Sequence, residues 1–257
     1  MNNYQGVQTD ETFQITEYTT DNGILTKEIG MDSEGKIRKY PDPITMKSGT
    51  ARKLPMTLPG FPEYLMGLGI NRAIGHGICE FEKTKITILK NFKNKSEAIP
   101  RSKDYFHYSD GATLAMIDHD PEDGQPVRDY QEVIKIIDSV CPGFAAIPKV
   151  LTYSTSSCIY HGNTELRGKG AGFHLYFLVK NGTDLPRFAE ALFHRLWLAG
   201  HGYIKISRSG SLLPRTIFDD KVFSPERFDF VAGAKLVGPG MVQRRPDPLY
   251  IPGGASC

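Results

Sequence analysis

Apolar residues along the chain follow two spacings, which predict where strands and helices lie. Short apolar runs predict three buried strands, over 113–117, 150–153 and 173–179. Apolar residues at helical spacing predict three helices, over 61–73, 130–140 and 184–197. Asp184 is placed to cap the last of these helices. Because strands and helices are mixed with hairpins, we predict the fold class α+β.

Turn-forming residues divide these elements. Residues 13–18 and 24–26 flank Asn22-Gly23, a pair that predicts a β-hairpin. Residues 32–60 are rich in Pro, Gly and Lys and predict an irregular connection. The stretch 241–257 finishes with Pro252-Gly253-Gly254-Ala255-Ser256-Cys257, which indicates a linker or the end of a module. With no internal repeat, we predict one domain over 1–257.

Composition is that of an ordinary soluble protein. Charged residues make up 23% and apolar residues 40% of the 257 residues, and the formal net charge is +2. Binding to nucleic acid would therefore depend on local patches rather than on overall charge. One basic stretch alternates with apolar residues and contains Lys83, Lys85, Lys90, Lys93, Lys95, Arg101 and Lys103. It predicts either an exposed strand that follows a phosphate backbone or an edge strand protected by lysines.

The four cysteines, Cys79, Cys141, Cys158 and Cys257, are widely spaced and form no Cys-x-x-Cys pair. This spacing predicts no structural zinc, and free thiols are typical of a reducing cytosol. Neither a signal peptide nor a membrane-length apolar run is present. We therefore predict a soluble, cytoplasmic protein.

The first candidate for chemistry is Asp118-His119-Asp120, directly after the strand at 113–117. Strand side chains alternate, so Asp118 and Asp120 face one side and His119 the other. Two adjacent carboxylates repel each other, and a divalent cation between them offsets that repulsion. The alternative interpretation is a solvated strand end, since residues 121–124 form a predicted loop.

Two further segments add candidates. His174 lies near the start of the strand at 173–179, just past the basic, glycine-rich stretch 167–172, a position that favours anion binding over a core role. Asp219 would share a face with Arg215 if 215–219 is extended, and could be a third carboxylate. Asp220 is the competing candidate for that role, and an ordinary Arg–Asp pair is the alternative to any site.

These segments resemble, in the same order, the motifs of the archaeo-eukaryotic primase superfamily, the primase-polymerases. The matching residues are Asp118 with Asp120, then Gly172-Phe173-His174, then Asp219. The branch from plasmids, phages and integrated mobile elements is the most similar, through residues 25–35, 154–157 and 206–227. The resemblance extends from about residue 12 to 240. The family often has Ser where this chain has Gly172, which puts a hydroxyl contact there in doubt.

The resemblance implies an N-terminal α/β subdomain and a C-terminal RRM-like subdomain around a central cleft. It also implies two Mg²⁺ or Mn²⁺ ions on Asp118, Asp120 and Asp219, and no organic cofactor. The triphosphate of a nucleotide would contact His174, Lys169, Ser156, Ser157 and Arg215. The expected partners are a single-stranded DNA template and nucleoside triphosphates. The expected location is the cytoplasm of a prokaryote, in association with the nucleoid or a plasmid. In the related mobile-element proteins such a module often precedes a helicase, so the resemblance also implies a helicase module as a partner within a longer protein.

Three functions agree with these residues. The first is a template-dependent nucleotidyltransferase that makes or extends primers. The second is a metal-dependent nuclease that uses the same carboxylates to activate water. The third is a non-catalytic module that binds single-stranded DNA. The strand-borne His174 after a basic loop favours a triphosphate site and hence the first function.

Overall fold

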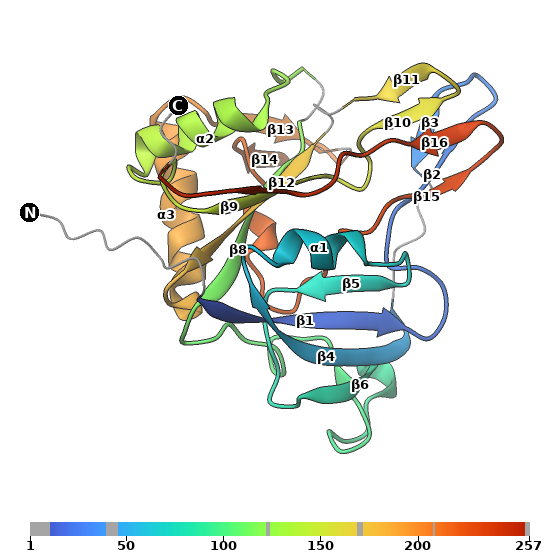
Figure 1. Cartoon of the computed structure of the whole chain (residues 1–257), viewed down its shortest axis with the longest axis vertical. Coiled ribbons are helices and arrows are strands. Elements are labelled where there is room, and N and C mark those ends of the chain that lie inside the picture. Colours follow the sequence, from blue (N-terminus) through green and yellow to red (C-terminus); the bar gives the residue numbers. More distant parts are fainter. Residues whose placement is uncertain (1–10, 40–45, 122–123, 169–171, 208, 255–257) are drawn as a thin grey trace, which may run out of the picture.

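The computed structural model describes residues 11–39, 46–121, 124–168, 172–207 and 209–254. Over these residues the chain is a mixed α/β protein in which strands pair into five sheets and helices are few (Figure 1). The predicted mixture of strands and helices is confirmed.

The first sheet contains five strands in the order β5-β1-β4-β6-β7. They are β1 (Thr12–Thr20), β4 (Ser48–Thr57), β5 (Arg72–Gly75), β6 (Lys83–Thr87) and β7 (Ile99–Pro100). The predicted hairpin between 13–18 and 24–26 is wrong, because β1 pairs with β4 and β5 while 24–26 form no strand. Gly23 does adopt a turn conformation, with φ of 87°, but the next strand begins only at Glu28.

Strand β4 also corrects the prediction that residues 32–60 are irregular. Its Pro55 pairs with Gln14 of β1, whereas β6 pairs with β4 only over 48–52. A proline has no N–H to donate, and at this end of β4 no second neighbouring strand requires one. The proline is therefore compatible with a ten-residue strand.

The second sheet is antiparallel and has the order β17-β9-β12-β8. Its strands are β8 (Thr113–His119), β9 (Lys149–Tyr153), β12 (Phe173–Val179) and β17 (Leu249–Ile251). The three predicted buried strands are confirmed as β8, β9 and β12. Alternate residues of β12 face two different cores: Phe173 and Phe177 face the helices, while Tyr176 and Leu178 face the first sheet. This sheet is therefore covered on both sides.

Three α-helices accompany the sheets: α1 (Phe61–Met66), α2 (Tyr130–Val140) and α3 (Leu185–Leu198). Helices α2 and α3 cover one face of the second sheet (Figure 1). Helix α1 is shorter than the predicted 61–73, since β5 already begins at Arg72. Asp184 does stand at the N-cap of α3, but its side chain makes no cap hydrogen bond and pairs with Arg187 instead.

Three small sheets complete the fold. One has the order β11-β10-β16 and contains β10 (Ile159–His161), β11 (Thr164–Arg167) and β16 (Met241–Gln243). Another has the order β15-β2-β3 and contains β2 (Glu28–Met31), β3 (Ile37–Lys39) and β15 (Lys235–Val237). The last is the hairpin of β13 (Tyr203–Ile206) and β14 (Leu212–Arg215). The prediction of a linker over 241–257 is wrong where β16 and β17 form, because these strands pair with β10 and β9.

Two further findings concern the described part of the chain. None of its helices has both the length and the apolar character needed to cross a membrane. Cys79, Cys141 and Cys158 are free thiols, and Cys79 and Cys158 are buried.

Candidate functional site

The three predicted motifs meet at one end of the second sheet. In the register of β8 and β12, Asp118 lies directly opposite His174. The backbone N–H of Asp219 donates to the carbonyl of Asp118 at 3.0 Å. A Cβ on residue 172 would lie 3.2 Å from Oδ1 of Asp120, so that carboxylate lies beside Gly172. Residues more than 50 positions apart in sequence are thus neighbours in the fold.

His174 is buried between two carboxylates. Its Nε2 lies 3.4 Å from Oδ1 of Asp118, and its Nδ1 lies 3.3 Å from Oδ1 of Asp229. Burial would lower the pKa of His174, but the charges of Asp118 and Asp229 outweigh burial and raise it. The residue is 8% exposed and carries positive charge more readily than a free imidazole.

Asp229 is the main site residue that the sequence did not indicate. Its Oδ2 accepts a 2.6 Å hydrogen bond from the hydroxyl of Tyr176 and lies 3.3 Å from Nε2 of His76. Burial alone would raise the pKa of Asp229, but the charge of His174 and the hydrogen bonds from His174 and His76 lower it strongly. The hydroxyl of Tyr176 also lies 3.0 Å from Nδ1 of His174. These residues form a buried polar chain behind Asp118.

The first and second sheets come together at this buried chain. Asp229 forms an isolated antiparallel bridge with Ile74 of β5, and His76 directly follows that strand. The only sequence signal for Asp229 is its place between Phe228 and Phe230, where alternation directs an acid away from two aromatic rings. That signal does not identify its partners, which come from β5 and β12.

Asp118 itself has an unusual environment. Burial raises the pKa of its carboxyl group, His174 opposes that rise, and the adjacent Asp120 adds to it. Two lysines lie close enough to act on this carboxylate, Lys27 and, on β3, Lys39. Burial and the charge of Lys27 lower the pKa of Lys39, while Asp120 raises it. The acids therefore lie beside a group of cations.

An open cleft of about 530 Å³ begins at Asp120. Lys39 and Arg167 line one part of it, and the four residues of β13 line another. In the hairpin register, Ile204 pairs with Pro214 and Ile206 with Leu212, so one face of the hairpin is wholly apolar. Ile206 and Leu212 are each 68% exposed. The cleft thus combines positive charge with an exposed apolar wall.

The predicted triphosphate donors Ser156 and Ser157 are fully buried. The hydroxyl of Ser157 donates to the carbonyl of Gly172 at 2.8 Å and lies 2.9 Å from the hydroxyl of Ser154. Ser156 lies 3.4 Å from the same Ser154 hydroxyl. In this structure the two serines hold the backbone that precedes His174 and do not face the cleft. Lys169, another predicted triphosphate contact, lies outside the described residues.

The predicted extended segment 215–219 is wrong, because β14 ends at Arg215 and a short 3₁₀-helix starts at Asp220. Arg215 lines a groove against α3 together with Asp220, so it does not share a face with Asp219. The side chain of Asp220 pairs with Lys221 at 2.8 Å. Asp219 remains the better placed of the two acids, since its backbone is bonded to that of Asp118.

Oxygen donors from Asp118, Asp120 and Asp219 suit Mg²⁺ or Mn²⁺ by chemistry. Among the described residues, however, no group of three His, Cys, Asp or Glu side chains is arranged to hold a metal ion. Asp118 faces His174, and the carboxylate of Asp219 accepts from the backbone N–H of Lys221. The three acids are neighbours, and the protein itself engages the side chains of Asp118 and Asp219.

Comparison of the chain with protein-family models, curated proteins and solved structures gives no match.

Proposed function

We propose that this protein is a template-dependent nucleotidyltransferase that makes or extends primers on single-stranded DNA, with the architecture of a primase-polymerase catalytic core. The supporting observation is the convergence of the three motifs: Asp118 opposite His174, Asp120 beside Gly172, and Asp219 bonded to the Asp118 backbone. In this proposal the first sheet belongs to the N-terminal subdomain and the second sheet to the C-terminal one.

The acids would hold the metal ions of the reaction. Asp118, Asp120 and Asp219 would bind Mg²⁺ or Mn²⁺, which neutralises the charge that develops on transferred phosphates. The raised pKa of Asp118 supports this role, because a half-buried carboxylate next to Asp120 is stabilised by a cation.

The cleft would bind the nucleotide. Lys39 and Arg167 would donate hydrogen bonds to the phosphates of the nucleotide. On the β13 side of the cleft, Ile204 and Ile206 offer exposed apolar surface to its base. His174 would donate from Nε2 to a phosphate oxygen in place of Asp118. Asp229 would keep His174 charged, because its carboxylate lies on the other ring nitrogen.

The test is incubation with unprimed and primed single-stranded DNA, Mn²⁺ and labelled ribo- or deoxynucleotides. Strands that lengthen support the proposal, strands that shorten indicate a nuclease, and bound but unchanged strands indicate a non-catalytic module.

The matched variants compare site acids with exposed acids. Asp118→Ala with Asp120→Ala should abolish incorporation while circular dichroism stays native. The control Asp110→Ala with Asp247→Ala also removes two carboxylates, both of them exposed and outside the site, and should leave incorporation unchanged. Full activity in the Asp118/Asp120 variant would exclude these acids as metal ligands.

A further inference from the structure

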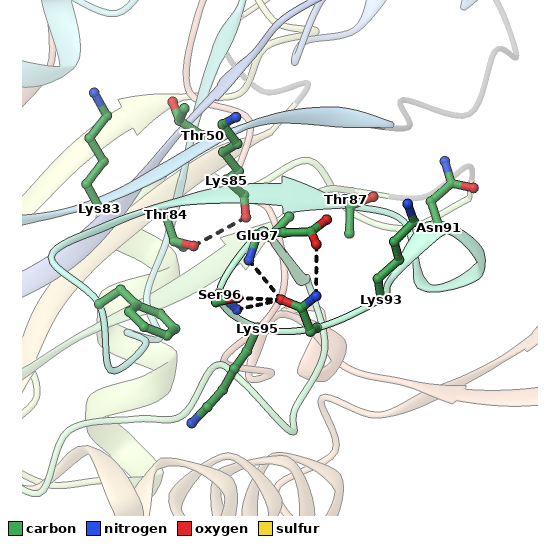
Figure 2. A pocket seen from close by; sticks show the side chains of 13 residues that line it. Thr50, Lys83, Thr84, Lys85, Thr87, Asn91, Lys93, Lys95, Ser96 and Glu97 are labelled. Carbon is green, nitrogen blue, oxygen red and sulfur yellow. Dashed lines mark hydrogen bonds between the residues drawn. The ribbon is translucent and has the colours of Figure 1, made fainter.

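A lysine-rich groove lies at the edge of the first sheet, on a surface that the proposed site does not use (Figure 2). Its volume is about 790 Å³. Its lining contains four lysines and one carboxylate, which are Lys83, Lys85, Lys93, Lys95 and Glu97. Hydroxyl and amide side chains also line it, from Thr50, Thr84, Thr87, Asn91, Asn94 and Ser96. This is a strong local excess of positive charge in a chain whose net charge is only +2.

The lysines come from two separate segments. Lys83 and Lys85 lie two residues apart on β6, so they share a face and are separated by about 7 Å along the strand. Figure 2 shows their side chains rising from the same side of β6, with Lys93 on the neighbouring loop. Asn94 stabilises that loop, because its side chain accepts from the backbone N–H of Ser96 at 3.1 Å and donates to Glu97 at 2.9 Å.

Most of this charge is not neutralised within the protein. Lys95 forms an ion pair with Glu80 at 3.3 Å, and the carboxylate of Glu97 accepts a hydrogen bond from the side chain of Asn94. Within the described residues, no carboxylate lies within ion-pair distance of Lys83, Lys85 or Lys93. Protection of an exposed strand edge would account for lysines on β6, which pairs with β7 over only two residues. It does not account for Lys93, which another segment brings to the same groove.

We propose that this groove binds the sugar-phosphate backbone of single-stranded nucleic acid. The choice of ligand rests on the proposed function, which requires a single-stranded template. Successive ammonium groups on one strand face can meet successive phosphates of an extended chain, and the threonine and asparagine side chains can donate to phosphate oxygens. An acidic peptide would also need apolar surface for its other side chains, and among the described residues that line this groove Phe81 is the only large apolar one.

The groove is separate from the chemistry. Figure 1 places β6 at the lower edge of the molecule and the β13–β14 hairpin, which borders the cleft, at the top. The groove would therefore hold a part of the strand remote from the reacting nucleotide. Its loss should weaken binding of long strands and leave the site itself intact.

The test is the salt dependence of binding of a fluorescent 30-nucleotide single strand, with no nucleotide or Mn²⁺ present. Lys83→Ala with Lys85→Ala and Lys93→Ala removes three phosphate contacts. Each contact contributes about 0.7 to the slope of log affinity against log salt, so the slope should fall by about 2. At 0.1 M salt the affinity should fall by about a hundredfold. The control replaces three exposed lysines outside the groove by Ala, which are Lys36, Lys135 and Lys180. It should change the salt slope and the affinity at 0.1 M salt less than the groove variant does.

The outcomes separate this proposal from the proposed function. An unchanged slope and affinity in the triple variant would overturn the groove proposal, whatever the protein catalyses. Loss of binding to polyglutamate but not to the single strand would overturn it in favour of an acidic protein partner. A wild-type protein that binds through the groove but incorporates no nucleotide would uphold the groove and refute the nucleotidyltransferase.

Discussion

Replacing Asp229 by Asn tests the buried polar chain behind Asp118. The substitution keeps the shape of the side chain and removes one negative charge that is 5% exposed. It takes away the partner of His174 at 3.3 Å and weakens the 2.6 Å hydrogen bond from Tyr176. Breaking one side of a buried ion pair costs about 3–5 kcal/mol, because the remaining charge stays buried without compensation. For a chain of this size we expect a fall in Tm of about 10 °C.

The pH dependence gives a sharper test than the size of the loss. The lowered pKa of Asp229 stabilises the fold above the unfolded value of about 3.9, and this stabilisation is lost as the pH falls through the folded pKa. The raised pKa of His174 stabilises the fold below about 6.5, and this stabilisation is lost as the pH rises through the folded pKa. The difference between wild type and variant should therefore be largest between about pH 4 and 6.5.

The assay is urea unfolding at several pH values, followed by circular dichroism and tryptophan fluorescence. Asp110→Asn is the control: this acid is exposed, and its replacement should change the free energy of unfolding by less than about 0.5 kcal/mol. A loss below about 1 kcal/mol for Asp229→Asn, equal at all pH values, would show that His174 is not held as a cation by this carboxylate.

Two further predictions concern the proposed reaction. Asp219→Asn should reduce nucleotide incorporation far more than Asp220→Asn, because the Asp219 backbone is bonded to Asp118 whereas Asp220 pairs with Lys221 beside α3; equal losses in primer-extension rates would contradict this assignment. His174→Ala should lower kcat/KM for the nucleotide by about ten- to a hundredfold, as expected for one charge-assisted contact, with template affinity nearly unchanged. Normal nucleotide binding with lost template binding would refute the role given to His174.

The central part of the fold could be predicted from sequence because local pattern determines it. Strands β8, β9 and β12 are apolar runs buried on both faces, and α2 has a clear amphipathic spacing with Asp129 as its cap. The structure adds that β9 and β12 pair in antiparallel fashion. The grouping of Asp118 with His174 was expected from the resemblance alone, because no local pattern gives the antiparallel pairing of β8 with β12.

The remaining features depend on contacts between distant segments. The Asn22-Gly23 turn indicates a hairpin locally, but Leu25 and Thr26 are buried elsewhere, and the hydroxyl of Thr26 donates to the carbonyl of Gly233 at 2.8 Å. No local pattern reveals a partner more than 200 residues away. Asp229 escaped prediction for the same reason, because His76 and Tyr176 reach it from separate parts of the chain.

The sheet pairings have a consequence for synthesis on the ribosome. Strand β2 pairs in parallel with β15, and β9 pairs with β17, so segments made early must wait for residues 235–251. Until these emerge, β2 has only β3 as a partner, and one edge of β9 stays open. Pairings of such long sequence separation form slowly, and unpaired strand edges promote aggregation. We therefore expect the nascent chain to depend on chaperones until its last strands have been translated.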